Sequence, residues 1–191
     1  MRIKRIFSLF SLTLVWVLFN AHPGWVQPLS GMPPKPGTPA PIITQAYAIE
    51  RGRYRDVLRI YIEADDPNGE MLRIATVVDQ PGYGHYPTDW IYLKPQFEHH
   101  LTGYLQWNTF SSNAPRLREW TQITMKVSVF DKAGNESNEV VFPFEFVSEV
   151  ISNPPPPAPF NNGIVSLLGH LHVNLFEPTE MGKGGAVSDH R

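Results

Sequence analysis

Apolar and polar residues alternate with a period of two through the middle of the chain. In VLRIYIEA, residues 57–64, the apolar side chains at every second position share one face, whereas Arg59 and Glu63 share the other. A strand with one buried face shows this pattern, because successive side chains point to opposite sides of a sheet. The pattern recurs clearly in residues 71–78, 122–130 and 140–147, and less regularly in 42–49, 89–93 and 103–110. We therefore expect about seven β-strands.

The octet DKAGNESN, residues 131–138, separates two of the most regular alternating segments. Asp131 and Asn135 can bond their own backbone, and Gly134 can adopt a positive φ without the steric cost of a Cβ atom. These residues predict a hairpin between the flanking strands. Pro143 has no amide hydrogen, so we expect its position in the second strand to lie at an edge or a bulge.

The string VSVFDKAGNESNEVVFPFEF resembles the final hairpin of bacterial immunoglobulin-like and fibronectin-type-III-like extracellular modules. IEADDPNGE, residues 62–70, is similar to the loop after the second strand of such modules, and of cadherin-like and PKD-like modules. The resemblance covers roughly residues 42–147 and implies an all-β fold, an immunoglobulin-like antiparallel β-sandwich. Turn signatures of this kind describe a fold and leave the function open.

Prolines divide the chain, because seven lie between Pro23 and Pro41 and five between Pro154 and Pro159. Such segments favour extended, polyproline-like spacers. We predict a proline-rich linker at 22–41, the sandwich at 42–151 and a spacer at 152–160. Residues 161–191 are then a C-terminal tail with a short apolar segment, and the termini are expected to be disordered or loosely attached.

Residues 1–21 have the composition of a signal peptide or a signal anchor. Arg2, Lys4 and Arg5 precede an apolar run, residues 6–19, that is short for a membrane span. Phe19 is bulky where a cleavage site prefers a small residue, so cleavage and retention as an anchor both stay open. We expect an exported protein that is periplasmic, secreted or on the cell surface, with membrane contact only through this segment.

Composition excludes some partners and kinds of site. The formal net charge is −2 at pH 7, which lacks the basic excess of a nucleic-acid-binding protein. The absence of cysteine excludes disulfides and thiolate metal sites. The sequence also lacks a Gly-x-Ser-x-Gly elbow, a phosphate-binding glycine loop and a zinc-binding helix signature. A non-catalytic protein is therefore expected, with an unrecognised hydrolase as the less favoured alternative.

Two loops of the expected sandwich would bring oxygen donors to one end. Hard oxygen ligands of this kind suit calcium. Each residue also has a sufficient role in a tight turn, which is the interpretation that we favour. Calcium is accordingly the one cofactor that the sequence allows, and its candidate ligands are Asp65, Asp66, Asn68, Asp131 and Asn135.

The opposite end of the expected sandwich gathers aromatic and basic residues from segments 79–90 and 111–120. Aromatic faces with an arginine rim can contact a sugar or a protein partner. For Trp90 we favour an inward-pointing side chain that closes the core, and for the tyrosines both orientations stay open. The candidate ligand-binding residues are Tyr83, His85, Tyr86, Trp90, Arg116 and Arg118.

The C-terminal tail carries an apolar stripe formed by Ile164, Leu167, Leu168 and Leu171. The spacing suits one face of a helix, although Gly169 interrupts it and the valines would also suit a short strand. The stripe either folds back on its own domain, which we favour, or docks a partner.

Together these features predict a non-catalytic binding or assembly module at the bacterial cell envelope or surface. Protein–protein interaction is the first function hypothesis, and carbohydrate binding through the aromatic loops is the alternative.

Overall fold

The computed structural model describes residues 37–177 except 115–116, 118–120, 151, 153 and 164. The predicted signal segment and most of the first proline-rich linker therefore lie outside the described residues, as does the end of the tail. Within the described part of the chain, no helix has the length and apolarity that crossing a membrane requires.

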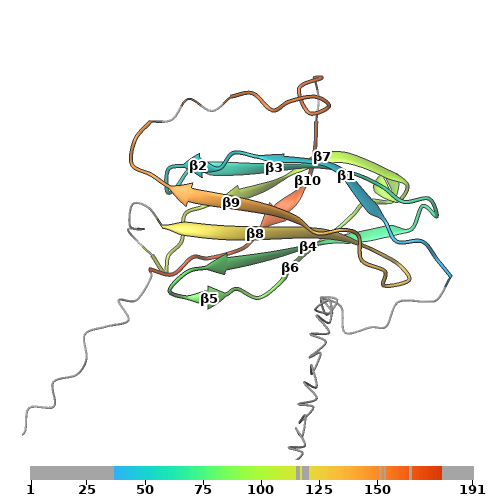
Figure 1. Ribbon diagram of the computed structural model, residues 1–191, viewed down its shortest axis with the longest axis horizontal. Helices are drawn as coiled ribbons and strands as arrows, with labels where there is room; N and C mark the ends of the chain where they lie inside the picture. The colour runs from blue at the N-terminus through green and yellow to red at the C-terminus, as the bar shows by residue number, and fades with distance from the viewer. Residues whose placement is uncertain are drawn as a thin grey trace, which may run out of the picture.

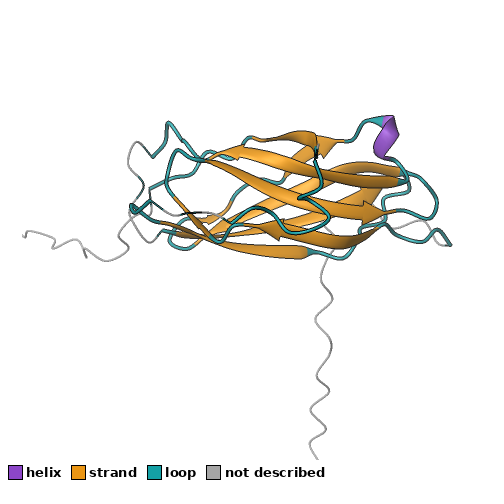
Figure 2. Ribbon diagram, turned by 90° about the horizontal axis from the view of Figure 1, so that it is seen from above, coloured by secondary structure: helices purple, strands orange, loops and turns teal. Residues whose placement is uncertain are grey.

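The chain forms two β-sheets that pack face to face (Figure 1). Sheet A has the strand order β1–β3–β7–β10, and sheet B has the order β2–β9–β8–β4–β5, with β6 also paired to β4. Strands make up both layers, and the short 3-10 helix η1 lies at one end of the body (Figure 2). The elements are β1 (Ile42–Ala48), β2 (Arg51–Gly52), β3 (Val57–Asp65), β4 (Met71–Gln80), β5 (Gly84–His85), β6 (Asp89–Tyr92), η1 (Pro95–Phe97), β7 (His100–Asn108), β8 (Gln122–Asp131), β9 (Val140–Phe146) and β10 (Ser166–Leu171).

The strand order is that of an immunoglobulin-like sandwich. In that fold strands A, B and E form one sheet with D, and strands C, F and G form the other. Here β1, β3 and β7 occupy positions A, B and E, whereas β4, β8 and β9 occupy C, F and G. The predicted all-β sandwich is confirmed, although two pairings, β2 with β9 and β10 with β7, are parallel.

Alternating burial follows from the alternating sequence. In β3, Leu58, Ile60 and Ile62 are buried, and their neighbours face solvent in part or in full. Strand β7 pairs antiparallel with β3 over its whole length and buries Leu101, Leu105 and Trp107 on the same face. The core between the sheets is therefore continuous. Its largest fully buried side chains include Trp107, Phe146, Ile60, Ile62, Met71, Ile74, Leu101, Leu105, Ile123, Met125 and Leu175.

The predicted hairpin between β8 and β9 is confirmed, with an antiparallel register from Gln122↔Glu145 to Val127↔Val140. Gly134 has a φ of +88°, as its place in the turn requires. Strand β2 pairs with β9 only at residues 145–146, so Pro143 stands on an open edge of sheet B, as expected for a residue without an amide hydrogen.

The C-terminal segment is part of the sandwich. Strand β10 pairs with β7 in the position that strand D takes in an immunoglobulin domain, and Val173 and Leu175 beyond it are buried. The predicted domain boundary at 151 therefore has to be moved to the end of this segment. The apolar stripe forms a strand rather than a helix, and it folds back on its own domain. Leu168 and Leu171 are buried, Leu167 is exposed, and Ile164 lies outside the described residues.

The proline-rich connection between β9 and β10 arches outside the two sheets (Figure 1). Phe160 anchors it on the outer face of sheet A, with its ring centroid 5.4 Å from that of Tyr61. Tyr61 lies in turn between Tyr47 and Tyr104, at centroid distances of 6.2 and 5.7 Å. One buried aromatic side chain thus fixes the middle of the crossover.

Candidate functional site

A tight turn after β4 presents Tyr83 at one end of the sandwich. The amide of Tyr83 donates to the carbonyl of Gln80 at 3.0 Å, which closes a four-residue turn. Pro81 and Gly82 occupy its central positions, and Gly82 has a φ of +83°. A type II turn needs this geometry, with proline first and a residue of positive φ second. The sequence QPGY therefore fixes where the Tyr83 ring projects.

Three aromatic rings meet at this turn, two from the loop after β4 and one, Phe176, from the distant C-terminal segment. The ring of Tyr83 stacks on that of Phe176 with a centroid distance of 4.6 Å and an interplanar angle of 9°. Tyr83 also stacks on Tyr86, at a centroid distance of 4.6 Å. Tyr86 is buried, whereas Tyr83 and Phe176 keep 45% and 37% of their surface exposed. Two nearly parallel rings thus reach solvent above a third that is held in the core.

Tyr86 and Gln80 hold the backbone of Phe176. The amide of Phe176 donates to the Tyr86 hydroxyl at 2.8 Å, and the Gln80 side-chain amide donates to the Phe176 carbonyl at 2.7 Å. The Tyr86 hydroxyl donates to the Gln80 side-chain oxygen, which closes the ring of contacts. Two further bonds hold this part of the tail, from Trp107 Nε1 to the Val173 carbonyl and from Ser111 Oγ to the Leu175 carbonyl.

Burial raises the pKa of Tyr86 to about 12, and the amide of Phe176 opposes this only in part. The folded protein then keeps the phenol proton over a pH range in which the unfolded chain, with the ordinary value of 10.0, loses it. Stability from this group is fully present below pH 10 and is lost as the pH rises toward 12.

We predict that unfolding midpoints in urea fall between pH 10 and 12 more steeply for the wild type than for Tyr86→Phe. That variant starts from a lower midpoint because it leaves the Phe176 amide without its acceptor. Tyr92→Phe, at a side chain that is 64% exposed, is the control and should follow the wild type. Parallel pH profiles for the wild type and Tyr86→Phe would contradict the assignment.

A cleft of about 420 Å³ opens beside the stacked rings. Asp89 is fixed in its wall, because its Oδ2 accepts the amide of His172 at 2.7 Å and lies 3.5 Å from His172 Nδ1. The side-chain amides of Asn113 and Asn174 make no hydrogen bond to the described residues. The lining comprises Tyr83, Tyr86, Pro87, Thr88, Asp89, Asn113, His172, Val173, Asn174 and Phe176. We call this site the aromatic cleft.

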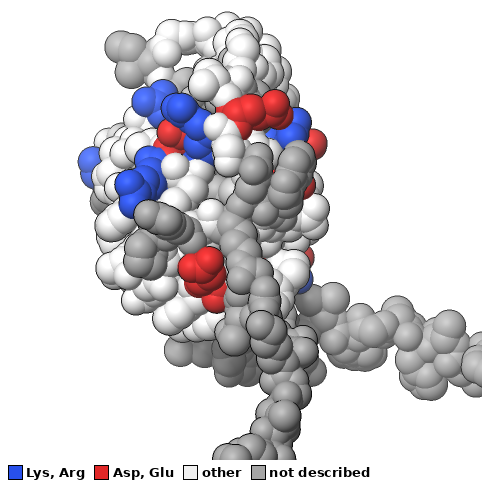
Figure 3. Space-filling model, turned by 90° about the vertical axis from the view of Figure 1, so that its left-hand side faces the viewer, with Lys and Arg blue, Asp and Glu red and all other residues white. Residues whose placement is uncertain are grey.

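The end of the molecule that holds the aromatic cleft carries charges of both signs. Basic and acidic side chains both appear on this face, and most of the described surface carries neither (Figure 3). Arg51 pairs with Glu145 and Glu149 at 3.2 and 3.3 Å, and Arg53 pairs with Asp56 at 3.3 Å. Because these arginines are neutralised locally, the described residues at this end produce no strong field of one sign.

The predicted ligand-binding residues do not all meet in the cleft. Tyr83 and Tyr86 line it, whereas the exposed His85 pairs with Asp79 on the edge of sheet B. Arg116 and Arg118 lie outside the described residues. The cleft also uses residues that the sequence did not single out, namely Asp89, Asn113, His172, Asn174 and Phe176.

The inward orientation favoured for Trp90 is wrong. Its ring lies on the outer face of sheet B, 5.3 Å from the ring of Phe130, and the Arg73 guanidinium stands 4.0 Å from its centroid. Ile91 is the neighbour that enters the core, because side chains alternate along β6.

At the opposite end, the two acidic loops lie side by side as predicted. The amide of Lys132 donates to the carbonyl of Glu70 at 2.9 Å. Asp66 and Asp131 are buried, and each of their carboxylate oxygens accepts one internal hydrogen bond. Asp66 accepts the amides of Asn68 and Glu70 at 2.9 and 2.8 Å. The structure thus gives both carboxylates a role in shaping turns.

The remaining candidate calcium ligands also have partners. Asn135 donates its amide and its side chain to Asp131 at 2.8 and 2.7 Å, and Asn68 donates to the Pro39 carbonyl at 3.2 Å. No group of three or more histidine or carboxylate side chains able to hold a metal is found among the described residues. The calcium site stays a prediction, which thermal unfolding with and without calcium would test.

Asp66→Ala is expected to lower the free energy of unfolding by about 1–3 kcal/mol in the presence of a chelator, because two partly buried amides lose their acceptor. Urea unfolding measures the change. Asp65→Ala changes an exposed neighbour and should cost under about 1 kcal/mol. Equal effects of the two variants would contradict the turn role of Asp66.

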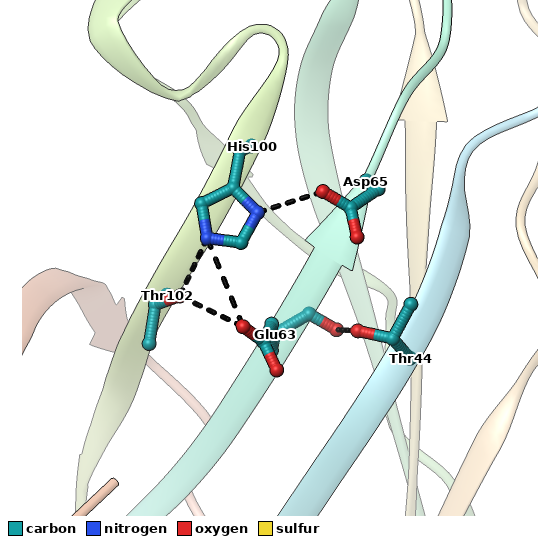
Figure 4. A network of polar contacts seen from close by, with 5 residues as sticks. All are labelled: Thr44, Glu63, Asp65, His100 and Thr102. Carbon is teal, nitrogen blue, oxygen red and sulfur yellow. Dashed lines mark hydrogen bonds and ion pairs between the residues drawn. The ribbon is translucent and has the colours of Figure 1, made fainter. Parts of the chain in front are cut away.

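Thr102, His100 and Asp65 have the hydrogen-bond order of a hydrolase triad (Figure 4). Thr102 Oγ1 lies 2.9 Å from His100 Nε2, and His100 Nδ1 lies 2.7 Å from Asp65 Oδ1. However, the side chains of His100 and Asp65 are 52% and 54% exposed on the open face of sheet A. Thr102 also donates to Glu63 at 3.4 Å. The backbone here pairs strand to strand, from Glu63↔Thr102 to Asp65↔His100. We interpret the group as cross-strand polar pairs.

Comparison with known proteins gives no family and a weak structural similarity. No family model matches the chain, and no curated protein matches its sequence. Among solved structures, the chain is similar to the CARDB domain of the PF1109 protein from Pyrococcus furiosus, which is described in complex with di-metal ions. The TM-score is 0.32 at 9% identity, over 57% of this chain and 94% of that chain. A similarity of this size carries no argument, so the fold assignment rests on the strand order.

Proposed function

We propose that the protein is an exported, non-catalytic binding module that takes a carbohydrate in the aromatic cleft. The observation that carries the proposal is the pair of nearly parallel, partly exposed rings of Tyr83 and Phe176, beside polar side-chain groups that make no hydrogen bond to the described residues. Two features of the sequence support action at the cell envelope: the resemblance to bacterial immunoglobulin-like modules, and the signal-peptide-like composition of residues 1–21.

A sugar ring has an apolar face of C–H groups and a rim of hydroxyls. An exposed aromatic face can pack against the former, and carboxylate and amide groups can bond the latter. In the cleft, Asp89 Oδ1 accepts no hydrogen bond from the described residues, and Asn113 and Asn174 each offer a donor and an acceptor. Its volume falls within the range of small-ligand sites, about 300–1,000 Å³. A neutral or weakly charged glycan fits the balanced charge of this end.

The proposal predicts that the protein is retained by at least one envelope or plant polysaccharide, and that Tyr83→Ala weakens retention at least about tenfold. Affinity electrophoresis in gels containing soluble polysaccharides measures this, together with sedimentation with peptidoglycan sacculi, chitin and cellulose. Tyr92→Ala removes an exposed tyrosine from the outer face of sheet B and should bind like the wild type.

Either of two results would contradict the carbohydrate site. The first would be that the wild-type protein is retained by none of these polymers. The second would be that Tyr83→Ala binds them as well as the wild type does and unfolds at the same urea concentration.

Protein–protein interaction, the function that the sequence favours, is the second candidate. The observation that bears on it is the edge of sheet A, where a strand from beyond the proline spacer fills a groove. An edge strand is a common place for a peptide from another chain to add to a sheet.

A further inference from the structure

Strand β10 occupies a groove whose walls belong to the rest of the sandwich. Sheet A supplies β7 as one wall, with register partners from Ser166↔Gly103 to Leu171↔Trp107, and β6 of sheet B lies along the other side. Leu168 and Leu171 point into this groove and are buried. The groove is therefore an acceptor for an extended segment, and the C-terminal strand is its occupant.

Two glycines, Gly103 on β7 and Gly169 on β10, allow the strand and the groove to approach each other closely. A Cβ atom on Gly103 would stand 2.5 Å from Leu168 Cγ and 2.7 Å from the Ser166 carbonyl oxygen. A Cβ atom on Gly169 would stand 2.5 Å from Ile91 Cγ2. All three distances are shorter than van der Waals contact, so each glycine is needed on its own side of the interface. The match is specific to this segment of the chain.

The connection that delivers the strand holds little structure of its own. Its described residues between β9 and β10 contain no strand, and the buried ones among them are Val147, directly after β9, and Phe160. Residues 154–159 are prolines apart from Ala158, and such segments extend by about 3.1 Å per residue. Because Phe160 packs on Tyr61 of sheet A, an exchange of β10 either lifts this ring from the sheet or redirects the chain between Phe160 and β10.

We propose that two copies of this protein exchange their C-terminal strands, so that β10 of each fills the groove of the other. The contacts in the groove are the same in both arrangements, and only the path of the connection differs. Within one copy the tether holds the strand at an effective concentration on the order of millimolar, so exchange requires copies at a comparable concentration. Exchange is thus favoured where copies are crowded, as on a surface.

Exchange would also make the aromatic cleft a joint site. Phe176 follows β10, so it would stack on Tyr83 of the other copy, and its backbone would bond to that copy's Tyr86 and Gln80. This step does not rest on the carbohydrate proposal, because the groove contacts stand without any ligand.

Cysteine capture tests the exchange, since the chain has no cysteine of its own. Gln106 and His170 face each other across β7 and β10. The double variant Gln106→Cys, His170→Cys should close an intramolecular disulfide in dilute solution, which shows that the pair can be bridged. The two single variants are then mixed as full chains at about millimolar concentration under mild oxidation, near the effective concentration of the tether.

The proposal predicts a disulfide-linked heterodimer in that mixture. Gln122→Cys mixed with Glu145→Cys is the matched control, because these register partners on β8 and β9 cannot exchange without opening the centre of sheet B. It reports cross-links from random collision. The proposal is overturned if the mixture of Gln106→Cys and His170→Cys forms no more heterodimer than this control does, although the double variant closes its internal disulfide.

Discussion

Gly169→Val is expected to lower the free energy of unfolding by about 1–3 kcal/mol, the usual cost of forcing extra carbon into a packed core. Valine is a better strand former than glycine, so local propensity alone predicts stabilisation. The structure predicts the opposite sign, because the new Cβ atom would meet the buried side chain of Ile91 at 2.5 Å. Ile91 is branched at Cβ and enclosed by the core, so it cannot move aside cheaply.

His170→Val is the matched control, since it places the same side chain on the next residue of the same strand, where the native side chain is exposed. It should change stability by less than about 0.5 kcal/mol. Urea unfolding followed by tryptophan fluorescence compares the two variants. If Gly169→Val were as stable as His170→Val, β10 would not be packed against β6.

Leu175→Ala is expected to cost about 2–5 kcal/mol, because it deletes a fully buried side chain and leaves a cavity. Leu175 lies beyond the last strand, in the tail whose apolar stripe the sequence favours as folding back on the domain without indicating which residues it contacts. Its carbonyl also accepts the Ser111 hydroxyl at 2.6 Å, which fixes the segment next to the cleft. The variant should therefore weaken ligand retention as well as stability.

Phe176→Ala separates these two effects. The backbone of Phe176 makes the bonds to Tyr86 and Gln80, and alanine keeps that backbone. Its half-exposed ring should cost less than about 1.5 kcal/mol on removal, whereas glycan retention should fall as it does for Tyr83→Ala. The same urea titrations and affinity gels provide both readings. A loss of stability for Phe176→Ala as large as that for Leu175→Ala would show that the ring belongs to the core.

The strands of the sandwich could be predicted because their pattern is local. One face of each strand is buried, so a period of two is visible in the sequence, and the turn at Gly134 requires residues that few other positions need. These signals do not depend on which strands become neighbours. They identified β1, β3, β4, β6, β7, β8 and β9.

The place of β10 was harder to predict because its partners are distant. Leu167, Leu168 and Leu171 suit a helical face as well as a strand, and nothing nearby in the sequence indicates an acceptor groove on β7. One signal was present in LHVNLF, residues 171–176, where Leu171, Val173 and Leu175 alternate with polar or exposed positions. The prolines that precede the strand indicated a boundary, whereas they form a crossover within the fold.

The candidate site was predicted in part for the same reason. Tyr83 and Tyr86 belong to one loop, so the sequence pointed to them together. Phe176 is 90 residues from Tyr86, and their contact depends on where the tail docks. In the acidic loops, turn chemistry and calcium binding use the same residue types, and only the structure shows that the oxygens of Asp66 and Asp131 already accept backbone or amide hydrogens.

The central claim is that the segment beyond the proline spacer completes both sheet A and the aromatic cleft. Hydrogen exchange of the backbone amides from Ser166 to Phe176, followed by mass spectrometry or NMR, tests it most directly. We predict strong protection, including at His172 and Phe176, whose amides donate to Asp89 and Tyr86 at 2.7 and 2.8 Å. Protection should approach that of β7, because the two strands share one set of pairings. Exchange at the rate of an unstructured peptide throughout residues 166–176 would contradict the claim and would leave the cleft without Phe176.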